Sequence, residues 1–520
     1  MATILPYLAL VAYLGLKGYN ETKNSADYMV GGRNIHPYVM AMSYGATFIS
    51  TSAIVGFGGI ASLFGMSMLW LPVLNIGVGV IIAFIFFGKR TRKMGLMLNA
   101  HTFPELLSKR VDSRFVQAST GAVIFVFMPL YTAAVLIGAS RILEGLLNIP
   151  YIYSVAIFSV LVAVYVIMGG LKGVMYTDAL QGTLMFGGMI ILLFFIYMNL
   201  GGIVDAHHSL SQMSSLIPEA LQKGGIYSWT GSAKFNSPLW WTIYSSIILG
   251  VGIGVLAQPQ LVVRFMTVKS NKEINRAVAI GSVFILVTVG TSFIVGALSN
   301  VYFMNTTGKI SIALAGGNAD KVIPLFINQA LPGWFGYLFM LVILSAAMST
   351  LSSQYHVIGT SIGRDFYEKG ISKNPKKGRE ILINRIGILI SILATVFLSL
   401  KLGDGVIATA TAIFFGLMAS CYLAPYIASL YWKNFTKQGM IAGIVSGFIT
   451  SIFCFLFIHA KEAAVFGLCK AITGKVTLFQ GVINFVDPMV IALPVSVLFT
   501  VGVTLLTKDE KSRKIADKLF

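Results

Sequence analysis

The chain has 520 residues, of which 56% are hydrophobic and 11% are charged, and its mean hydropathy is +0.81. So little polar surface excludes a soluble globular protein and indicates an integral membrane protein. The net charge of +19 does not indicate nucleic-acid binding, because Lys and Arg lie in short loops between apolar segments and not on one amphipathic face. The three cysteines, Cys421, Cys454 and Cys469, are dispersed and match neither a disulfide framework nor a metal motif.

Apolar segments long enough to cross a bilayer follow one another along the whole chain. We expect an all-α membrane protein with a single integral membrane domain over residues 1–520. The N-terminal segment has no basic start and no small-residue cleavage site, so it is predicted to be a retained helix and not a signal peptide. The thirteen predicted spans cover residues 3–19, 37–64, 68–88, 116–146, 150–168, 172–198, 239–262, 277–304, 333–362, 383–401, 405–432, 438–459 and 485–507.

The loops between these spans differ in charge. One alternate set of loops, which includes 89–115, 264–276, 364–385 and the C-terminal tail, holds most of the 38 Lys and Arg residues. Because positively charged loops stay in the cytoplasm, the C-terminus is predicted to be cytoplasmic and the N-terminus to be outside. Within the first of these loops, a capping-box pattern from Thr102 to Glu105 predicts a short amphipathic helix that ends near Arg110.

Two spans are less uniformly apolar than the others and are predicted to be broken helices. Span two contains a hydroxyl-rich and glycine-containing stretch at 43–52, and span seven has a glycine-rich stretch that ends at Gln258-Pro259. These spans open two blocks of five, 37–198 and 239–432, which begin on opposite sides of the membrane and therefore form the inverted repeat of many transporters. Close packing of unbroken helices through small residues is the alternative for each span.

Two polar features lie inside apolar spans. Asp178 is the only carboxylate predicted to lie well within a span, and no Lys or Arg is predicted at its depth. Inserting such a group costs at least ~2.5 kcal/mol, so it usually lines an ion pathway or pairs with a cation; a protonated Asp bonded to a neighbouring helix is the alternative. In span nine, Ala346, Ser349, Thr350 and Ser353 share one helical face, and such oxygens suit Na⁺ or interhelical hydrogen bonds.

Four segments of the sequence form a recognisable set: YMVGGR at 28–33, GGLKGVMYTD at 169–178, Gln258-Pro259 followed by Val263-Arg264-Phe265, and AAMSTLSS at 346–353. In these segments the chain resembles the sodium/solute symporters, over roughly 28–440. The resemblance implies a LeuT-type fold of about 13 transmembrane helices and a Na⁺-coupled secondary active symporter that works by alternating access.

The resemblance implies one sodium site and, in some members, a second. The first site would use the carbonyls of Ala46, Ile49 and Ala346 and the hydroxyls of Ser349 and Thr350. The second would use Asp178, Ser349, Ser352 and Ser353. With both sites filled, import of one monovalent anion moves one net charge across the membrane, and with one Na⁺ the cycle is electroneutral.

The transported solute is expected to be a small carboxylate, because span two resembles the pantothenate and monocarboxylate members. Phe48 stands where proline-transporting members carry an aspartate, and Val251 and Val255 stand where they carry aromatic residues, which argues against proline. A neutral amino acid or a sugar is the alternative solute. The residues expected to contact the solute are Thr47, Phe48, Thr51, Trp70, Asn75 and Gln258.

Other functions find little support in the sequence. A proton-coupled transporter or a channel subunit would need a chain of ionisable residues inside the membrane, and only Asp178 is predicted there. No nucleotide-binding loop or nucleophile motif is present, so we expect no enzyme. Arg141 and Glu144 are predicted to form an interfacial ion pair, and His207-His208 lacks matching metal ligands. The expected surroundings are the lipid bilayer of a prokaryotic plasma membrane.

Overall fold

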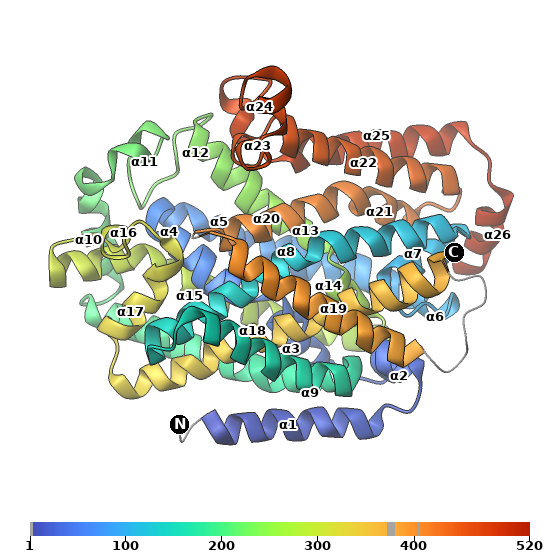
Figure 1. The fold of residues 1–520 in the computed structure, drawn as a ribbon, viewed down its shortest axis with the longest axis horizontal. Coiled ribbons are helices and arrows are strands. Elements are labelled where there is room, and N and C mark those ends of the chain that lie inside the picture. Colours follow the sequence, from blue (N-terminus) through green and yellow to red (C-terminus); the bar gives the residue numbers. More distant parts are fainter. Residues whose placement is uncertain (1–3, 372–379, 404) are drawn as a thin grey trace.

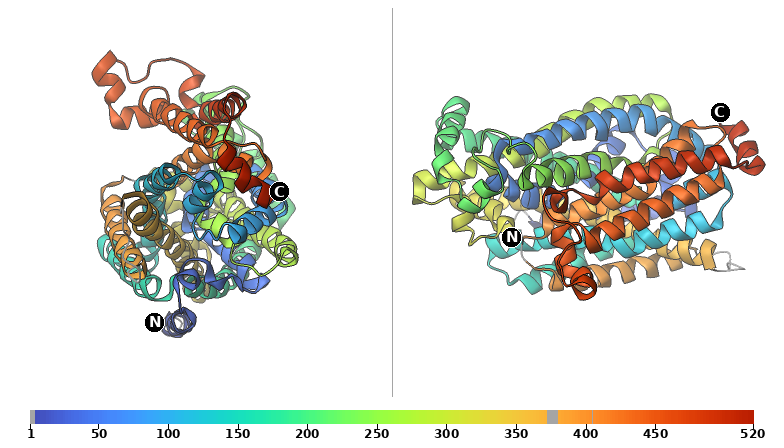
Figure 2. Two further views of the ribbon diagram at one scale, coloured as in Figure 1. Left: turned by 90° about the vertical axis from the view of Figure 1, so that its right-hand side faces the viewer. Right: turned by 90° about the horizontal axis from the view of Figure 1, so that it is seen from above.

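The structure is a computed structural model that describes residues 4–371, 380–403 and 405–520. Within these ranges the chain is helical, and the β pairing is confined to one parallel bridge between Ile35 and Val268. Long helices run along the long axis of the molecule (Figure 1), and an end-on view shows them packed into a bundle (Figure 2). The predicted all-α membrane fold is confirmed.

The bundle is built from helices that match the predicted spans. In the described residues, ten helical stretches are long and apolar enough to cross a membrane, and Tyr151–Ile167 is a shorter apolar helix. The helices of the bundle are α1 (Ile4–Glu21), α3 (Pro37–Phe48), α4 (Gly58–Phe64), α5 (Trp70–Leu74), α8 (Arg114–Leu147), α9 (Tyr151–Asn199), α12 (Pro238–Trp241), α13 (Gly252–Gly254), α14 (Pro259–Phe265), α15 (Asn271–Thr307), α18 (Gly333–Thr360), α19 (Glu380–Lys401), α20 (Ile407–Met418), α21 (Ala424–Tyr431), α22 (Lys437–Phe457) and α25 (Pro488–Leu506).

Several of these helices continue through π-helical segments, and shorter helices lie in the connections. The π-helical segments are η2 (Ser52–Phe57), η4 (Asn75–Gly88), η6 (Thr242–Val251), η9 (Ser361–Ile371) and η10 (Ala419–Leu423). The connecting helices are α2 (Ser25–Val30), α6 (Lys89–Met97), α7 (Phe103–Val111), α10 (Ile203–Gln212), α11 (Glu219–Lys223), α16 (Ser311–Leu314), α17 (Val322–Ala330), α23 (Ala460–Phe466), α24 (Leu468–Thr473) and α26 (Glu510–Leu519).

The centre and the periphery of the bundle differ in burial. Nearly all side chains in the second half of α18 and in α20 are buried, whereas α25 exposes large apolar side chains such as Leu498 and Leu505. Figure 1 and Figure 2 place α1 on one outer side of the bundle and α22 with α25 on the opposite side. An exposed apolar face on a long helix suits contact with lipid, as on α25. The buried helices α18 and α20 form the interior of the bundle.

The predicted break in span two is present and has a local cause. α3 ends where Ile49 takes an extended conformation, with φ −87° and ψ 94°. The hydroxyl of Ser50 then accepts a hydrogen bond from the amide of Ser52 at 3.1 Å. Hydroxyl side chains that bond to nearby backbone compete with the helical ladder. The Ser50-Thr51-Ser52 run therefore interrupts the helix, which resumes as η2.

The predicted break in span seven follows from proline chemistry. Gln258 has φ −76° and ψ 116°, outside the helical region, and Pro259 is the first residue of α14. A residue before proline is pushed away from helical geometry, and proline is well accommodated at the first position of a helix. α14 therefore begins inside the bundle. The inverted-repeat relation between 37–198 and 239–432 stays a prediction.

Spans five and six are joined without a loop. α9 runs from Tyr151 to Asn199, and the bend between the two predicted spans falls at Gly170, which has a φ of 57°. A Cβ at this position would lie 2.6 Å from the ring of Tyr28, so both the backbone angle and the close approach require glycine. This bend directs the second half of α9, which carries Asp178, into the bundle.

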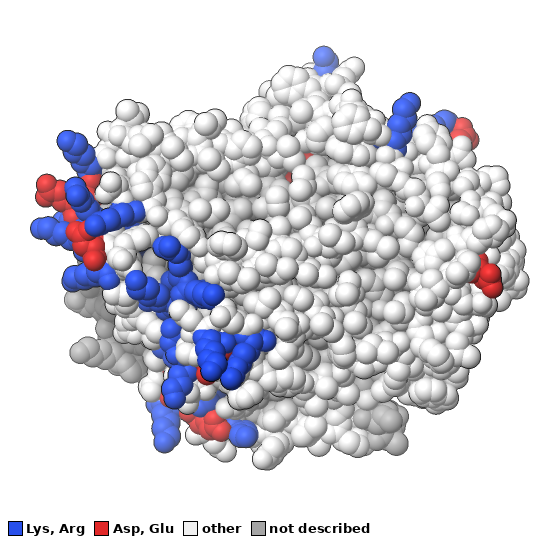
Figure 3. Space-filling model, turned by 180° about the vertical axis from the view of Figure 1, so that it is seen from behind, with Lys and Arg blue, Asp and Glu red and all other residues white. Residues whose placement is uncertain are grey.

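Basic side chains gather at one end of the molecule (Figure 3), the end at which Figure 1 draws α6, α7 and α26. The first turn of α1 and helix α26 lie at opposite ends of the bundle (Figure 1). Both features agree with the charge-based orientation, in which the C-terminus is cytoplasmic. That orientation stays a prediction.

The short helix predicted after span three is confirmed as α7, and a buried carboxylate holds it in place. The hydroxyl of Thr102 accepts from the amide of Glu105 at 3.1 Å, and the carboxylate of Glu105 accepts from the amide of His101 at 2.9 Å. The same carboxylate lies 3.0 Å from Nη2 of Arg364 and 2.9 Å from Nζ of Lys109. Burial alone would raise the pKa of Glu105, but hydrogen bonds and charges from His101, Arg364 and Lys109 hold it well below its usual value.

Candidate ion-binding and substrate site

A first cluster of oxygens forms where α18 passes the broken end of α3. The hydroxyl of Ser349 lies 2.9 Å from the carbonyl oxygen of Ala46 and 3.3 Å from that of Ala346. The hydroxyl of Thr350 lies 3.4 Å from the carbonyl oxygen of Ala46 and 3.2 Å from that of Thr47. Ser349 and Thr350 are fully buried. This first cluster therefore consists of neutral oxygens, close enough to contact one small cation together.

Ile49 completes the predicted ligand set from the backbone side. It is the residue after the last turn of α3, and its extended conformation turns its carbonyl out of the helical register. Carbonyls released in this way at an interrupted helix are the groups that bind coupling ions in broken-helix transporters. Of the five predicted ligands, the structure brings Ala46, Ala346, Ser349 and Thr350 into hydrogen-bond contact and places Ile49 at the break beside them.

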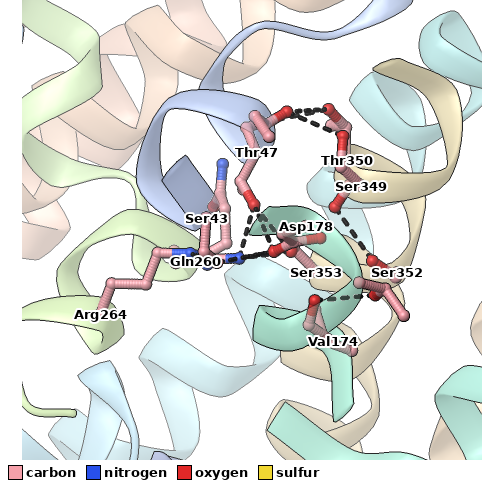
Figure 4. A network of polar contacts seen from close by, with 12 residues as sticks. Ser43, Thr47, Val174, Asp178, Gln260, Arg264, Ser349, Thr350, Ser352 and Ser353 are labelled. Carbon is pink, nitrogen blue, oxygen red and sulfur yellow. Dashed lines mark hydrogen bonds and ion pairs between the residues drawn. The ribbon is translucent and has the colours of Figure 1, made fainter. Parts of the chain in front are cut away.

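A second cluster surrounds Asp178 and contains an arginine (Figure 4). The carboxylate oxygen Oδ2 of Asp178 accepts from the hydroxyl of Ser43 at 2.7 Å and from that of Thr47 at 3.3 Å. Nη2 of Arg264 lies 2.9 Å from the same oxygen, and the side chains of Arg264 and Asp178 are 1% and 0% exposed. Nη2 also contacts the hydroxyls of Thr47 and Ser353. The second cluster is therefore a buried ion pair inside a ring of hydroxyl groups.

The prediction that no Lys or Arg reaches the depth of Asp178 is wrong. Arg264 is five residues beyond Pro259, at the last turn of the short helix α14, which begins inside the bundle. Helical side chains point toward the N-terminus of their helix, and a long arginine side chain extends this reach. Arg264 therefore points back from the end of span seven toward the middle of the bundle. The sequence signal was the combination of a break at Gln258-Pro259 with an arginine shortly after it.

The two halves of the hydroxyl stretch on α18 have different partners. Ser349 and Thr350 face α3, as described above. The hydroxyl of Ser352 donates to the carbonyl of Ser349 on its own helix at 3.0 Å, and no bond to Asp178 is found for it in the described chain. The hydroxyl of Ser353 lies 2.9 Å from that of Thr47 and 2.6 Å from Nη2 of Arg264. Of the predicted second sodium site, only Asp178 and Ser353 share a common partner.

A small cavity of about 20 Å³, roughly the space that one water molecule needs, lies next to the first cluster. Its walls come from the broken span two, from spans three and seven, and from the helices around them. The described residues that line it carry no charge; they are Phe48, Ile49, Ser50, Ala53, Phe57, Leu71, Asn75, Tyr131, Val251, Val289, Phe293, Thr411 and Phe415. Asn75 is buried, and its Oδ1 has no hydrogen-bond partner in the described part of the chain. The lining is largely apolar with a few polar groups, as in small-molecule sites, and a solute would enter only after the surrounding helices moved apart.

Only two of the six residues expected to contact the solute, Phe48 and Asn75, line this cavity. Thr47 belongs to the Asp178 cluster, and Thr51 donates to the carbonyl of Val135 at 2.6 Å. Gln258 donates to the carbonyl of Gly254 at 3.2 Å. Trp70 is 58% exposed and does not line the cavity. The structure thus places Phe48 and Asn75 at the cavity and the other four residues outside its lining, and the assignment of the six to the solute stays a prediction.

The remaining polar residues that the sequence singled out lie away from these clusters. Arg141 and Glu144 form the predicted ion pair at 2.7 Å. Nε2 of His207 contacts the hydroxyl of Tyr197 at 3.0 Å. The described residues contain no group of three or more His, Cys, Asp or Glu side chains placed to hold a metal ion. These residues add no second centre of chemistry.

Broken helices that meet a cluster of oxygens inside a membrane bundle are typical of a secondary transporter. The chain belongs to the sodium:solute symporter family, whose model matches residues 28–447. It is thus a symporter of a small solute, and Na⁺ is its coupling ion. The family resemblance predicted from the sequence over roughly 28–440 is confirmed.

Comparisons with individual proteins support this placement. The chain is 25% identical to the osmoregulated proline transporter OpuE of Bacillus subtilis (strain 168), over 88% of this chain and 89% of that protein. It is 28% identical to a sodium/proline symporter of Staphylococcus aureus (strain bovine RF122 / ET3-1), over 91% and 89%. A solved Na⁺-coupled sialic acid symporter, in a substrate-bound outward-open state, superposes with a TM-score of 0.77 at 21% identity over 97% of both chains. The fold is therefore of the LeuT type. The expected lean toward pantothenate and monocarboxylate members finds no support in these relatives.

Proposed function

We propose that this symporter imports a small monocarboxylate by alternating access, driven by Na⁺ bound at the first cluster. The observation that carries the proposal is the convergence of the Ser349 and Thr350 hydroxyls on the carbonyls released at the break in α3. Binding of Na⁺ there would tie α18 to the broken span two. A ligand shifts a conformational equilibrium when it binds one state better, so this contact couples the ion to the state of the transporter.

The character of the neighbouring cavity supports a compact anion as solute. Ile49 contributes to the cavity wall and is also a proposed ligand of the ion, so a carboxylate bound there would lie close to Na⁺. The Asn75 amide would supply a hydrogen bond to the carboxylate, and Phe48, Phe57 and Phe415 would cover its apolar part. A positively charged protein group is not required, because Na⁺ supplies the compensating charge.

Proline is a second candidate, because two of the similar proteins are named as proline transporters. Proline carries an ammonium group as well as a carboxylate. An ammonium group in an enclosed site needs a carboxylate or several acceptor oxygens as partners. The described lining offers Phe48 at the break and no acidic residue, which favours a solute without an amino group.

The two solute classes are separable by ligand binding and by charge movement. We would first compare thermal stabilisation of the purified protein by short monocarboxylates, proline and sugars, with and without Na⁺, because a bound ligand raises the apparent stability of the folded state. The solute that stabilises only with Na⁺ would then be tested for uptake into proteoliposomes. Stabilisation by proline and not by any monocarboxylate would reject the monocarboxylate proposal.

The ion site is tested independently of the solute. Replacing Ser349 and Thr350 together by Ala is expected to abolish the Na⁺-dependent part of both stabilisation and uptake. Ser345→Ala is the matched control, because Ser345 is a buried hydroxyl on the same helix that bonds to Tyr7 of α1 at 3.2 Å. Unchanged Na⁺ dependence in the double variant would refute the assignment of the ion to the first cluster.

A further inference from the structure

We propose that Arg264 is a built-in cation that takes the place of a second Na⁺ beside Asp178, so that one Na⁺ is coupled to each solute. This inference rests on the proposed function, because it leaves the first cluster as the ion site. The family resemblance implied one sodium site and, in some members, a second. The geometry of the second cluster bears on whether one or two Na⁺ ions bind in each transport cycle.

The guanidinium group of Arg264 is held from all sides. Nε donates to the hydroxyl of Ser43 at 2.8 Å, and Nη1 donates to the carbonyl of Gln260 on its own helix. Nη2 contacts Asp178, Thr47 and Ser353, as shown in Figure 4. These partners belong to α3, α9, α14 and α18. An arginine with each nitrogen engaged in a buried site is a fixed part of that site and not a passing side chain.

The oxygens that a second Na⁺ would need are the same oxygens that bind Arg264. Oδ2 of Asp178 and the hydroxyls of Thr47 and Ser353 all face Nη2. The hydroxyl of Ser352, another proposed ligand, bonds to its own helix. A cation at the second cluster would therefore have to displace the guanidinium group. Of the two carboxylate oxygens of Asp178, Oδ1 has no hydrogen-bond partner among the described residues.

The charge balance points the same way. Asp178 and Arg264 are both fully buried and together are neutral. Adding Na⁺ at Oδ1 would place two cations beside one carboxylate within the membrane, where an uncompensated charge is costly. The first cluster has no such conflict, because its carbonyl and hydroxyl oxygens are neutral and no cation contacts them in the described chain. Na⁺ is therefore directed to the first cluster.

The experiment counts ions by linkage, with Na⁺ alone as the probe. The thermal stability of the purified protein is followed against the logarithm of Na⁺ concentration at constant ionic strength, with choline as the replacing cation. Well above the dissociation constant, the slope is proportional to the number of Na⁺ ions bound by the folded state. The variants are Arg264→Gln, Arg264→Lys and the double variant Arg264→Gln/Asp178→Asn.

The proposal predicts a slope for one ion in the wild type and a twofold steeper slope in Arg264→Gln, because removal of the guanidinium frees Asp178 and its hydroxyl groups for a second Na⁺. Arg264→Lys keeps a cation and is expected to stay at one ion. Arg264→Gln/Asp178→Asn removes the carboxylate as well and is expected to return to one ion. Binding of ²²Na⁺ at saturation provides the same count by a second method.

Two results would overturn the inference. One is a two-ion slope in the wild type, which is decisive even if Arg264→Gln does not fold. The other is a folded Arg264→Gln variant that stays at one ion. These results differ from a failure of the proposed function, which would appear as no Na⁺ dependence in the wild type or as an unchanged slope when Ser349 and Thr350 are replaced by Ala.

Discussion

Among the described residues, two arginine–carboxylate pairs are buried: Arg264–Asp178 in the middle of the bundle, the central pair, and Arg364–Glu105 beside α7, the peripheral pair. The partners around the two pairs differ. Glu105 accepts from the backbone of His101 and is contacted by Lys109 as well as by Arg364. The partners of Asp178 are all side chains, from α3 and α14. The contacts of Glu105 fix the start of helix α7. The contacts of Asp178 join separate helices through side chains, which can separate without breaking any backbone hydrogen bond.

This difference indicates which contacts can rearrange during the transport cycle. Alternating access requires helices that move relative to one another around a fixed site. Contacts made by side chains between α3, α14 and α18 can be exchanged for others during such a motion, whereas a capped helix start is lost only by local unfolding. We therefore expect changes at Asp178 to affect both stability and ion binding, and changes at Glu105 to affect stability alone.

The largest expected effect is on stability, from breaking the central pair. Asp178→Asn leaves the charge of Arg264 in a fully buried site, so the free energy of unfolding in mixed micelles should fall by about 3–5 kcal/mol. The double variant Asp178→Asn/Arg264→Gln removes both charges and should be more stable than the single variant. If the two substitutions destabilise additively, the pair is not coupled and the comparison between the two pairs fails.

A smaller loss of stability is expected for the peripheral pair. Glu105→Gln should lower the free energy of unfolding by about 1–3 kcal/mol, because Arg364 loses the charge of this carboxylate but Lys109 already reaches solvent, with 36% of its side chain exposed. Na⁺ affinity should not change in this variant, because Glu105 contacts neither oxygen cluster. Unfolding and Na⁺ titration of the same preparation provide both values. A weakened Na⁺ affinity would show that α7 communicates with the ion site.

Much of this arrangement was predictable from local patterns in the sequence. The break in span two follows from Ser50-Thr51-Ser52, and the start of α14 follows from Gln258-Pro259, because hydroxyl side chains and proline act on their own backbone. The first-cluster residues Ser349 and Thr350 were found by helical spacing and by the family resemblance. Features of this kind are encoded within a few residues.

Features that depend on contacts between distant segments were not predictable in the same way. Arg264 was assigned to a loop because span seven was predicted to end at residue 262, and only the position of α14 shows that its side chain turns inward. Trp70 was assigned to the solute from its place in span three, yet the packing of α5 leaves it at the surface. The orientation of a side chain around a helix axis is set by neighbouring helices, which a single span does not specify.

Two serines on α18, Ser349 and Ser352, are expected to differ in their effect on Na⁺ affinity. Ser349→Ala removes a hydroxyl that lies 2.9 Å from the carbonyl of Ala46, and the apparent dissociation constant for Na⁺ should rise about tenfold, equivalent to about 1.4 kcal/mol. Ser352→Ala is the matched control, because its hydroxyl bonds to its own helix, and it should change the constant less than about twofold. Equal effects in both variants would contradict the assignment of the ion to the first cluster alone.

The smallest expected effect is the pH dependence that Glu105 of the peripheral pair contributes in the acid range. The pKa of Glu105 is held below its usual value of 4.5 in the folded protein, as described above, whereas the unfolded chain titrates near that value. Below about pH 4.5 the unfolded chain binds a proton that the folded chain does not, so the contribution of Glu105 to stability is complete above this pH and is lost as the pH falls. The slope from this one group is at most about 1.4 kcal/mol per pH unit.

Glu105→Gln should therefore give a flatter decline of the free energy of unfolding than the wild type between about pH 5 and pH 3.5. Parallel curves for the two proteins would mean that Glu105 gains no net stabilisation from Arg364 and Lys109, and the contrast with the central pair would then rest on ion binding alone.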